Sequence, residues 1–358
     1  MYTYSDVRAE NKINIIFLCG VFFDKDSLDD KRIVLKKFLE KNIKNKVIIL
    51  EDNFGFKEDD NTILLYKDIG LRNLCEIESL TAFLSDCIFI IHESLSTATE
   101  LGVFASNEEL RKRICLLVPD ELSVEENKLS GFIKLAFTNR GSVKTIKFFP
   151  ETYINRISFN TASYHSKFKN NEIGKFLGGN INKFINKVVS NQINNKIIRN
   201  NYCKPKRENT AYWINKQSKQ CVIFIDGMNM KYQIMAVFSL AEFRREFREQ
   251  EALVDAISLV QNYYESILIN TVSSKEGEEL ENYKIEFKIC NLSNDNLKLR
   301  TAIAYILYLL HAMKCIEIPN RDVKQKLIIG RAFTPIYTEL AQLINSTNDF
   351  DMEELYAE

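Results

Sequence analysis

Short apolar runs alternate with amphipathic stretches over the first 150 residues. Continuous apolar runs are typical of strands buried on both faces, and an apolar residue every three or four positions is typical of a helix. On these criteria we expect strands at 13–19, 47–50, 86–91, 113–118 and 143–148, and helices at 27–41, 69–84, 97–109 and 121–137. Strands separated by helices predict right-handed crossovers and therefore an α/β fold with a doubly wound, parallel, five-stranded sheet.

Beyond residue 150 the helical period dominates. The pattern predicts an Asn-rich helix at 180–201, a loop or linker at 200–218 and a mainly helical segment at 228–272. It then predicts a helix at 297–313, strands at 315–318 and 326–329 around a polar turn at 319–325, and a last helix at 334–344. This order is typical of a winged helix, although a β-hairpin that caps a helical domain has the same pattern.

The expected organisation is therefore in four parts. They are a sheet domain at 1–150, a basic and then helical region at 151–290, a winged-helix-like domain at 291–347 and an acidic tail at 348–358.

Charge is distributed unevenly along the chain. There are 48 basic and 48 acidic residues in total, but 140–220 contains 16 Lys or Arg and three acidic residues, a local charge of +13. Aromatic residues are interleaved with these cations, as in surfaces that follow phosphates and stack on bases, although a charge run is often a solvated face. The expected nucleic-acid contacts are Lys167, Lys169, Lys175, Lys183, Lys187, Lys204, Lys206 and Arg207.

The composition, 46% hydrophobic and 27% charged, is typical of a globular protein. No apolar run reaches the roughly 18 residues of a membrane span, and the polar first twelve residues are unlike a secretion signal, so we expect a cytoplasmic protein without a membrane partner. The eight cysteines contain no CxxC pair, which favours buried reduced thiols and no metal site.

Residues 86–102 contain the candidate chemistry. In a doubly wound sheet the site lies at the carboxyl ends of the strands, where Gly20, Asp52 and 92–97 are expected. The hydroxyls of Ser94, Ser96 and Thr97, together with free N–H groups of a helix start, suit a phosphate or a sugar hydroxyl. Glu100, one turn into that helix, would face the same cleft.

Each of the candidate site residues also has a structural interpretation. Thr97 and Glu100 have the spacing of a capping box, in which the glutamate binds the N-cap amide. Asp86 can be a strand-edge residue and His92 an ordinary strand-end histidine. Glu78 can face the cleft, but its position on a predicted helix is more typical of a solvated face.

A family resemblance bears on this choice. Phe17-Leu18-Cys19-Gly20, Glu51-Asp52, Ser85-Asp86 and the stretch from His92 to Phe104 resemble a nucleoside deoxyribosyltransferase-like, Rossmann-like domain. More narrowly, Glu93-Ser94 and the stretch from Thr99 to Arg113 resemble the toxic effectors of bacterial retrons of the Ec86/St85 type. The resemblance extends over about 13–148 and beyond it concerns layout alone.

The resemblance implies cleavage of an N-glycosidic bond. Glu100 would attack the anomeric carbon, while Asp86, Glu93 or Asp52 would donate a proton or hold ribose hydroxyls, and Gly20 would allow close backbone approach. In related defence effectors the bond is that between nicotinamide and ribose in NAD, which would here be a substrate, with no cofactor. The turn before Glu100 lacks the Asp-rich sequence of the transferases, so base and sugar specificity do not carry over.

The implied partner is a retron reverse transcriptase with its msDNA and msrRNA, which would hold the toxin inactive until phage infection. Related transferases share sites between subunits, so an oligomer is expected.

Two other hypotheses remain. One is a nucleoside or nucleotide deoxyribosyltransferase or N-hydrolase, and the other is a non-catalytic nucleotide-sensing DNA-binding regulator, whose output should survive Glu100→Gln.

Overall fold

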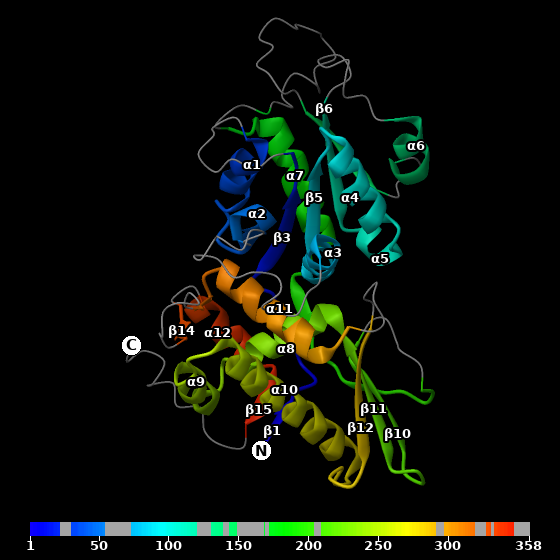
Figure 1. Cartoon of the computed structure of the whole chain (residues 1–358), viewed down its shortest axis with the longest axis vertical. Helices are drawn as coiled ribbons and strands as arrows, with labels where there is room; N and C mark the ends of the chain where they lie inside the picture. The colour runs from blue at the N-terminus through cyan, green and yellow to red at the C-terminus, as the bar shows by residue number, and fades with distance from the viewer. Residues whose placement is uncertain are drawn as a thin grey trace, which may run out of the picture. The chain divides into compact units, whose positions relative to one another are not determined.

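Figure 1 shows the chain in a computed structural model. The structure describes residues 1–21, 30–53, 73–119, 130–138, 143–148, 168, 172–203, 209–290, 297–318, 327–330 and 333–346. So far as they are described, Ile13–Phe54 and Leu74–Ser190 form one compact unit, the sheet unit, while Met1–Lys12 and Asn191–Glu358 belong to a second, the helical unit. The boundaries of the two units differ from those of the expected domains. Residues 172–190 belong to the sheet unit, and the described residues on both sides of residue 290 belong to the helical unit.

The sheet unit contains the predicted five-stranded parallel sheet. Its strand order is β4 (Asn45–Ile48), β3 (Asn14–Cys19), β5 (Cys87–Ile91), β6 (Ile114–Pro119) and β7 (Lys144–Phe148). The chain reverses its direction across the sheet between β3 and β5. Ligand sites of open parallel sheets lie at such a reversal, outside the carboxyl ends of the strands. The ends of β3 and β5 are therefore the place to look for a site.

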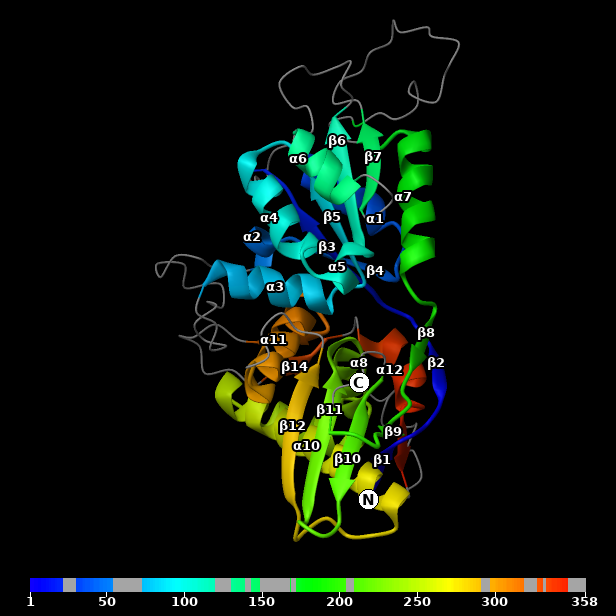
Figure 2. The ribbon, with the colours of Figure 1, turned by 90° about the vertical axis from the view of Figure 1, so that its right-hand side faces the viewer.

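Helices cover both faces of this sheet (Figure 2). α1 (Lys31–Leu39) and α7 (Lys175–Val188) pack on one face, where Val34, Leu35, Ile181 and Phe184 join a core with Phe89. The other face carries α3 (Leu74–Leu84) and α4 (Leu95–Ala105). Shorter helices connect these layers: α2 (Leu50–Asn53), α5 (Glu108–Arg111), α6 (Gly131–Ile133) and the π-helical turn η2 (Lys134–Thr138).

The helical unit contains more strands than the sequence pattern predicts. A four-stranded sheet has the order β12 (Lys284–Cys290), β11 (Gln220–Asp226), β10 (Ala211–Asn215) and β9 (Ile198–Arg199), and β2 (Arg8–Glu10) pairs with β8 (Gln192–Asn194). The expected helix at 180–201 is thus wrong in its bounds, because α7 begins at Lys175 and ends at Val188. The expected linker at 200–218 is wrong where it contains β10.

The expected helical segment at 228–272 is confirmed. It contains α8 (Gly227–Val237), α9 (Ala241–Arg248) and α10 (Leu253–Glu276). Gly277 ends α10 in the left-handed region at φ 63°, where glycine has no steric penalty.

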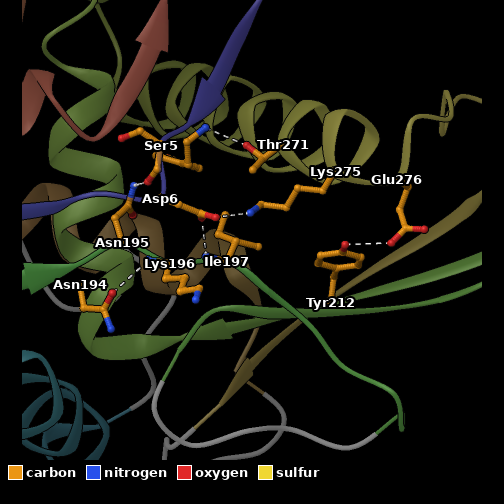
Figure 3. Close-up of polar contacts among 11 residues, drawn as sticks. Ser5, Asp6, Asn194, Asn195, Lys196, Ile197, Tyr212, Thr271, Lys275 and Glu276 are labelled. Atoms are coloured by element: carbon orange, nitrogen blue, oxygen red, sulfur yellow. Dashed lines mark hydrogen bonds and ion pairs between the residues drawn. The ribbon is translucent and has the colours of Figure 1, made fainter.

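The first residues of the chain are held in the helical unit by hydrogen bonds (Figure 3). The Tyr4 backbone N–H donates to Thr271 Oγ1 at 2.8 Å, and the Asp6 carboxylate pairs with Lys275. β1 (Tyr2–Tyr4) also pairs with β15 (Ile344–Ser346) near the other end of the described chain. The unit is therefore built from both ends of the sequence.

The C-terminal part contains the expected helix and hairpin. α11 (Leu299–Ala312) precedes β13 (Ile316–Glu317) and β14 (Ile328–Ile329), which pair antiparallel, and α12 (Thr334–Ala341) follows. The polar turn at 319–325 and the acidic tail lie outside the described residues, and the winged helix stays a prediction. None of the helices described here has the length and apolar character needed to cross a membrane.

Candidate functional site

The candidate site begins at the carboxyl end of β3. Gly20 follows the last residue of that strand, and the side chain of Arg32 from α1 lies directly against it. A Cβ atom at Gly20 would lie 2.8 Å from Arg32 Cδ, which is closer than real Cβ contacts. The missing side chain of Gly20 makes room for this arginine, and the expected approach of a ligand to its backbone stays a prediction.

Arg32 is an almost fully buried cation, with 2% of its side chain exposed. Its Nη1 donates to Glu51 Oε1 at 2.8 Å, and its Nε lies 3.7 Å from Asp30 Oδ1. Asp30 is the N-cap of α1 and accepts the Arg32 backbone N–H at 2.8 Å. The guanidinium is therefore held between the beginning of α1 and the carboxylate of α2.

Glu100 lies in the second turn of α4 and has no part in capping that helix. Ser94 is the N-cap: its Oγ accepts the Thr97 backbone N–H at 3.3 Å, and Thr97 Oγ1 accepts the Ser94 N–H at 3.2 Å. The two residues complete a capping box. The interpretation of Thr97 and Glu100 as the capping box is therefore wrong, because the helix begins three residues earlier.

The Glu100 side chain is half-buried and faces the end of β3. The Cys19 thiol lies close enough to lower the pKa of its carboxyl, while Oε2 is shielded from solvent and has no hydrogen-bond partner among the described residues. Burial, and next the charges of Glu78 and Glu51, raise the pKa of Glu100 to about 8, while Arg32 acts in the opposite direction. Glu100 is therefore a half-buried carboxyl with one oxygen that no described residue satisfies.

Glu78 on α3 belongs to the same constellation. Burial, followed by the charge of Glu51, raises its pKa to about 7. The expected solvated helix face is thus wrong for Glu78. Glu51, Glu78 and Glu100, called here the acidic cluster, come from α2, α3 and α4 and act on one another electrostatically. Two carboxyls with raised pKa values, here Glu78 and Glu100, near the carboxyl edge of a sheet are typical of a functional site.

Of four other expected residues, three lie at the beginning of α4 or directly before it, and Asp52 lies on α2. Glu93 forms a 2.6 Å ion pair with Lys31, and Asp52 forms one of 2.6 Å with Lys36. Ser96 Oγ lies 2.7 Å from Ser94 Oγ. Thr97 is buried, so of the three hydroxyls its role is structural.

His92 directly follows β5 and contacts the beginning of α4. Its Nδ1 is 3.4 Å from Thr97 Oγ1, and burial lowers its pKa. The imidazole is therefore neutral at pH 7 and can neither compensate the acidic cluster nor bind an anion by charge.

Asp86 lies at the other edge of the sheet. It precedes β5, is buried, and accepts the Ile15 backbone N–H at 2.7 Å through Oδ2. Its own backbone N–H donates to the Ile15 carbonyl at 2.8 Å. Its carboxylate thus joins β5 to β3, and the structure does not bring it to Glu100.

Comparison with known proteins identifies the family. Residues 29–318, which include the whole acidic cluster, match the STM3845 retron effector protein family, and this range covers 290 of the 358 residues. The chain belongs to the STM3845 retron effector family.

Two Escherichia coli relatives of this retron effector match part of it. The chain is 30% identical over 150 residues to the "Retron Ec73 putative ribosyltransferase/DNA-binding protein". The aligned stretch covers 40% of this chain and 43% of that relative. It is also 30% identical over 153 residues to the "Retron Ec86 putative ribosyltransferase/DNA-binding protein", which is 43% of this chain and 44% of that relative. The chain thus matches less than half the length of both relatives.

Three residues of the retron effector's site were missed in the sequence, or given another role. Arg32 follows Asp29, Asp30 and Lys31 on a predicted helix, and this charged run gave no sign that its side chain is buried. Glu51 was not singled out because the motif favoured its neighbour Asp52 equally. Cys19 was not singled out because it ends an apolar strand and resembled a core residue. A glycine directly after β3 was the available signal, because a missing side chain there indicates that another group approaches the backbone.

The expected nucleic-acid residues of the retron effector are only partly described. Lys175, Lys183 and Lys187 are exposed along α7, together with the partly exposed ring of Phe176. The other five, Lys167, Lys169, Lys204, Lys206 and Arg207, lie outside the described residues. The α7 lysines thus meet the first requirement of a phosphate-binding surface, which is access to solvent.

Proposed function

We propose that this retron effector is an N-glycosidase toxin of an antiphage system and that it hydrolyses the nicotinamide–ribose bond of NAD with Glu100. The observation that carries this proposal is the buried Oε2 of Glu100, which has no hydrogen-bond partner among the described residues. A buried polar atom without a partner costs free energy, so it calls for an explanation, of which a catalytic role is one. The names of the two relatives, which include ribosyltransferase, also support glycosyl chemistry.

Glycosidic cleavage requires a carboxylate beside the anomeric carbon. The transition state resembles an oxocarbenium ion, which a carboxylate stabilises or traps as an ester. With NAD, Glu100 would bond to the anomeric carbon as the carbon–nitrogen bond breaks, and the electron pair would pass to the pyridinium nitrogen. Neutral nicotinamide would then leave. Water would displace the ester, giving ADP-ribose, a released proton and free Glu100.

The charges around Glu100 favour a substrate with a cationic ring at the bond to be cleaved. The acidic cluster has three carboxyls, and Arg32 compensates part of their charge. A pyridinium ring would supply further positive charge at the site and would favour the ionised form of Glu100. Because nicotinamide leaves from an already cationic ring, no proton donor is needed.

A nucleoside or nucleotide deoxyribosyltransferase or N-hydrolase is the second candidate. A nucleobase is a poorer leaving group and generally needs a proton from the enzyme. Glu78, with its pKa raised to about 7, is half protonated near neutral pH and could supply that proton. Release of a nucleobase, with nicotinamide left in place, would favour this candidate.

The proposed partner is a retron reverse transcriptase with its msDNA. Membership of a retron effector family and the term DNA-binding in the names of both relatives support contact with retron nucleic acid. The α7 lysines are the described residues that we assign to this contact. A higher-order assembly with the partner is part of the same proposal. A nucleotide-sensing regulator would use the same surfaces without turnover.

Product analysis tests the proposed function. Purified effector, with and without its co-expressed reverse transcriptase and msDNA, would be incubated separately with NAD, adenosine and deoxyadenosine, and the products separated by chromatography. We expect nicotinamide and ADP-ribose from NAD alone. Free adenine would support the second candidate, and no turnover in either preparation would refute glycosidase function and favour the regulator.

A further inference from the structure

We propose that the outward face of α7 binds a single strand of nucleic acid, with Gly179 giving the strand access to the helix and Phe176 stacking on one of its bases. The inference rests on the proposed contact with retron nucleic acid and deepens it, because it assigns the form of the nucleic acid and two contacts that carry no charge. It is independent of the chemistry at Glu100.

The outward face of α7 is polar and basic. The helix packs beside β7 (Figure 2), and Leu177, Ile181 and Phe184 on its inner side are buried in the core of the sheet unit. Acidic residues are absent from the sequence between Glu172 and Glu208. A face of this charge fits a polyanion. Its exposed residues are three lysines, two asparagines, one phenylalanine and one glycine: Lys175, Phe176, Gly179, Asn182, Lys183, Asn186 and Lys187.

Two adjacent glycines in the middle of α7 have different surroundings. A Cβ atom at Gly178 would lie 2.7 Å from Cζ of Phe38 on α1, so the close packing of these two helices leaves no room for a side chain there. Apart from the backbone of its own helix, a Cβ atom at Gly179 would meet no atom of the described residues within 4 Å. Glycine destabilises the interior of a helix relative to alanine, and at Gly179 no packing contact in the described chain explains its presence.

Gly179 lies within the row of α7 lysines. Residues four positions apart lie on the same side of a helix, and Gly179 is four residues after Lys175 and four before Lys183. Lys187 continues the row, which is about 18 Å long at 1.5 Å per residue, so several successive phosphates can lie along it. The missing side chain at Gly179 leaves an opening between two cations, where the sugar-phosphate backbone can approach the helix closely.

The uncharged residues of this face favour a single strand over a duplex. The ring of Phe176 is 39% exposed and directly follows Lys175, so a base beside a bound phosphate can stack on it. The bases of a duplex already stack on one another, and only an unpaired base presents its face. Asn182 and Asn186 carry amides that can both donate to and accept from the edges of unpaired bases.

The substitution Gly179→Leu tests the opening without changing a charge. The full chain would be titrated into a fluorescein-labelled oligothymidylate, with binding followed by fluorescence anisotropy at several salt concentrations. We expect Gly179→Leu to weaken binding by about fivefold or more, while the slope of log affinity against log salt stays unchanged because no cation is lost. Gly102→Leu is the matched control, since a Cβ atom there also meets nothing within 4 Å among the described residues but lies on α4, on the other face of the sheet. It should bind like wild type.

The substitution Phe176→Ala tests the stacking contact. It should weaken binding of the oligothymidylate by about tenfold, again with the salt slope unchanged. A duplex of the same length should bind more weakly than the single strand, and Phe176→Ala should leave the affinity for the duplex unchanged. Circular dichroism would show that each variant is folded. Phe176→Leu, which keeps apolar bulk and loses the flat ring, replaces Phe176→Ala if that variant fails to fold, and Gly179→Ala replaces Gly179→Leu with a smaller expected loss.

Wild-type affinity for the oligothymidylate in the folded Gly179 and Phe176 variants would overturn the inference, without bearing on other nucleic-acid contacts of the effector. Displacement of the oligothymidylate by polyglutamate at equal charge would also overturn it, because any polyanion would then suffice. If wild type bound no nucleic acid, both the inference and the proposed contact with retron nucleic acid would fail. Nicotinamide release tests the proposed chemistry separately.

Discussion

The pH dependence of nicotinamide release follows directly from the environment of Glu100. In the ligand-free effector, burial and the charges of Glu78 and Glu51 raise the pKa of Glu100 to about 8. A glutamate that acts as nucleophile must be ionised. The value of kcat/KM reports groups in the free enzyme, so it should rise with pH and reach half its maximum near pH 8.

The size of the effect can be worked out from this pKa. With a pKa of about 8, roughly a tenth of Glu100 is ionised at pH 7 and roughly nine-tenths at pH 9. We therefore expect kcat/KM to increase about tenfold between these pH values. An exposed glutamate would already be fully ionised at pH 7 and would give a flat profile.

A bound cation should change the profile in a particular direction. The pyridinium ring of NAD favours the carboxylate of Glu100, so the pKa falls in the complex. Since kcat reports the enzyme–substrate complex, its midpoint should lie at a lower pH than that of kcat/KM. Glu78→Gln removes a neighbouring negative charge and should lower the midpoint of kcat/KM as well.

The assay is the initial rate of nicotinamide release at subsaturating and saturating NAD from pH 6 to 9.5. Circular dichroism at each pH would show that the protein stays folded. A flat kcat/KM profile would refute the reasoning about the buried carboxylate. A profile that falls above pH 8 would also refute it, because it would mean that Glu100 acts as a proton donor.

Three further predictions concern stability and nucleic-acid binding. Because the pKa of Glu100 is raised, its contribution to stability is complete below the unfolded-state pKa of 4.5 and is lost as pH rises toward about 8. The free energy of unfolding of wild type, measured in urea, should therefore fall by up to about 1.4 kcal/mol per pH unit relative to that of Glu100→Gln. Parallel dependences of the unfolding free energy on pH in the two proteins would contradict this. Asp86→Ala leaves the Ile15 N–H without its acceptor and should cost about 1–3 kcal/mol, while nicotinamide release per folded molecule stays unchanged, and a selective loss of turnover would place Asp86 in the chemistry after all. Charge reversal of the three α7 lysines, Lys175, Lys183 and Lys187, should weaken binding of single-stranded DNA, measured by fluorescence anisotropy, and reduce the slope of log affinity against log salt by up to about 2. Lys37→Glu is the control, and an unchanged slope would remove α7 from the interface.

The sheet and its reactive edge could be predicted because both depend on local pattern. Apolar runs such as 13–19 can be buried only as central strands, and parallel strands bring their carboxyl ends together. Glu100 followed from its place after β5. Asp86 could have been excluded on the same basis, since a residue that precedes a parallel strand lies at the opposite edge.

The acidic cluster could not be predicted, because it depends on packing between distant segments. Glu51, Glu78 and Glu100 lie on three separate helices, and each resembles an ordinary surface residue in its own segment. Arg32 is buried because Gly20 makes room for it, a relation that spans twelve positions. The capping register was ambiguous for a different reason: Ser94 and Thr97 both suit an N-cap, and tertiary packing chose the first.

The strands of the helical unit were missed because their residues alternate weakly. β10 has one partly exposed tryptophan among buried neighbours, and β8 and β9 are only three and two residues long. β8 obtains its order from pairing with β2, which lies far away in the sequence, and β9 from pairing with β10. Periodicity within a window cannot detect this.

The most direct test of the central claim is the rate of nicotinamide release by Glu100→Gln relative to wild type. The substitution keeps the size of the side chain and removes its ability to become a carboxylate, and Lys37→Gln serves as a matched control on the surface. We predict a loss of about a thousandfold or more in kcat, with the fold and partner binding intact. Turnover by Glu100→Gln within tenfold of wild type would contradict it.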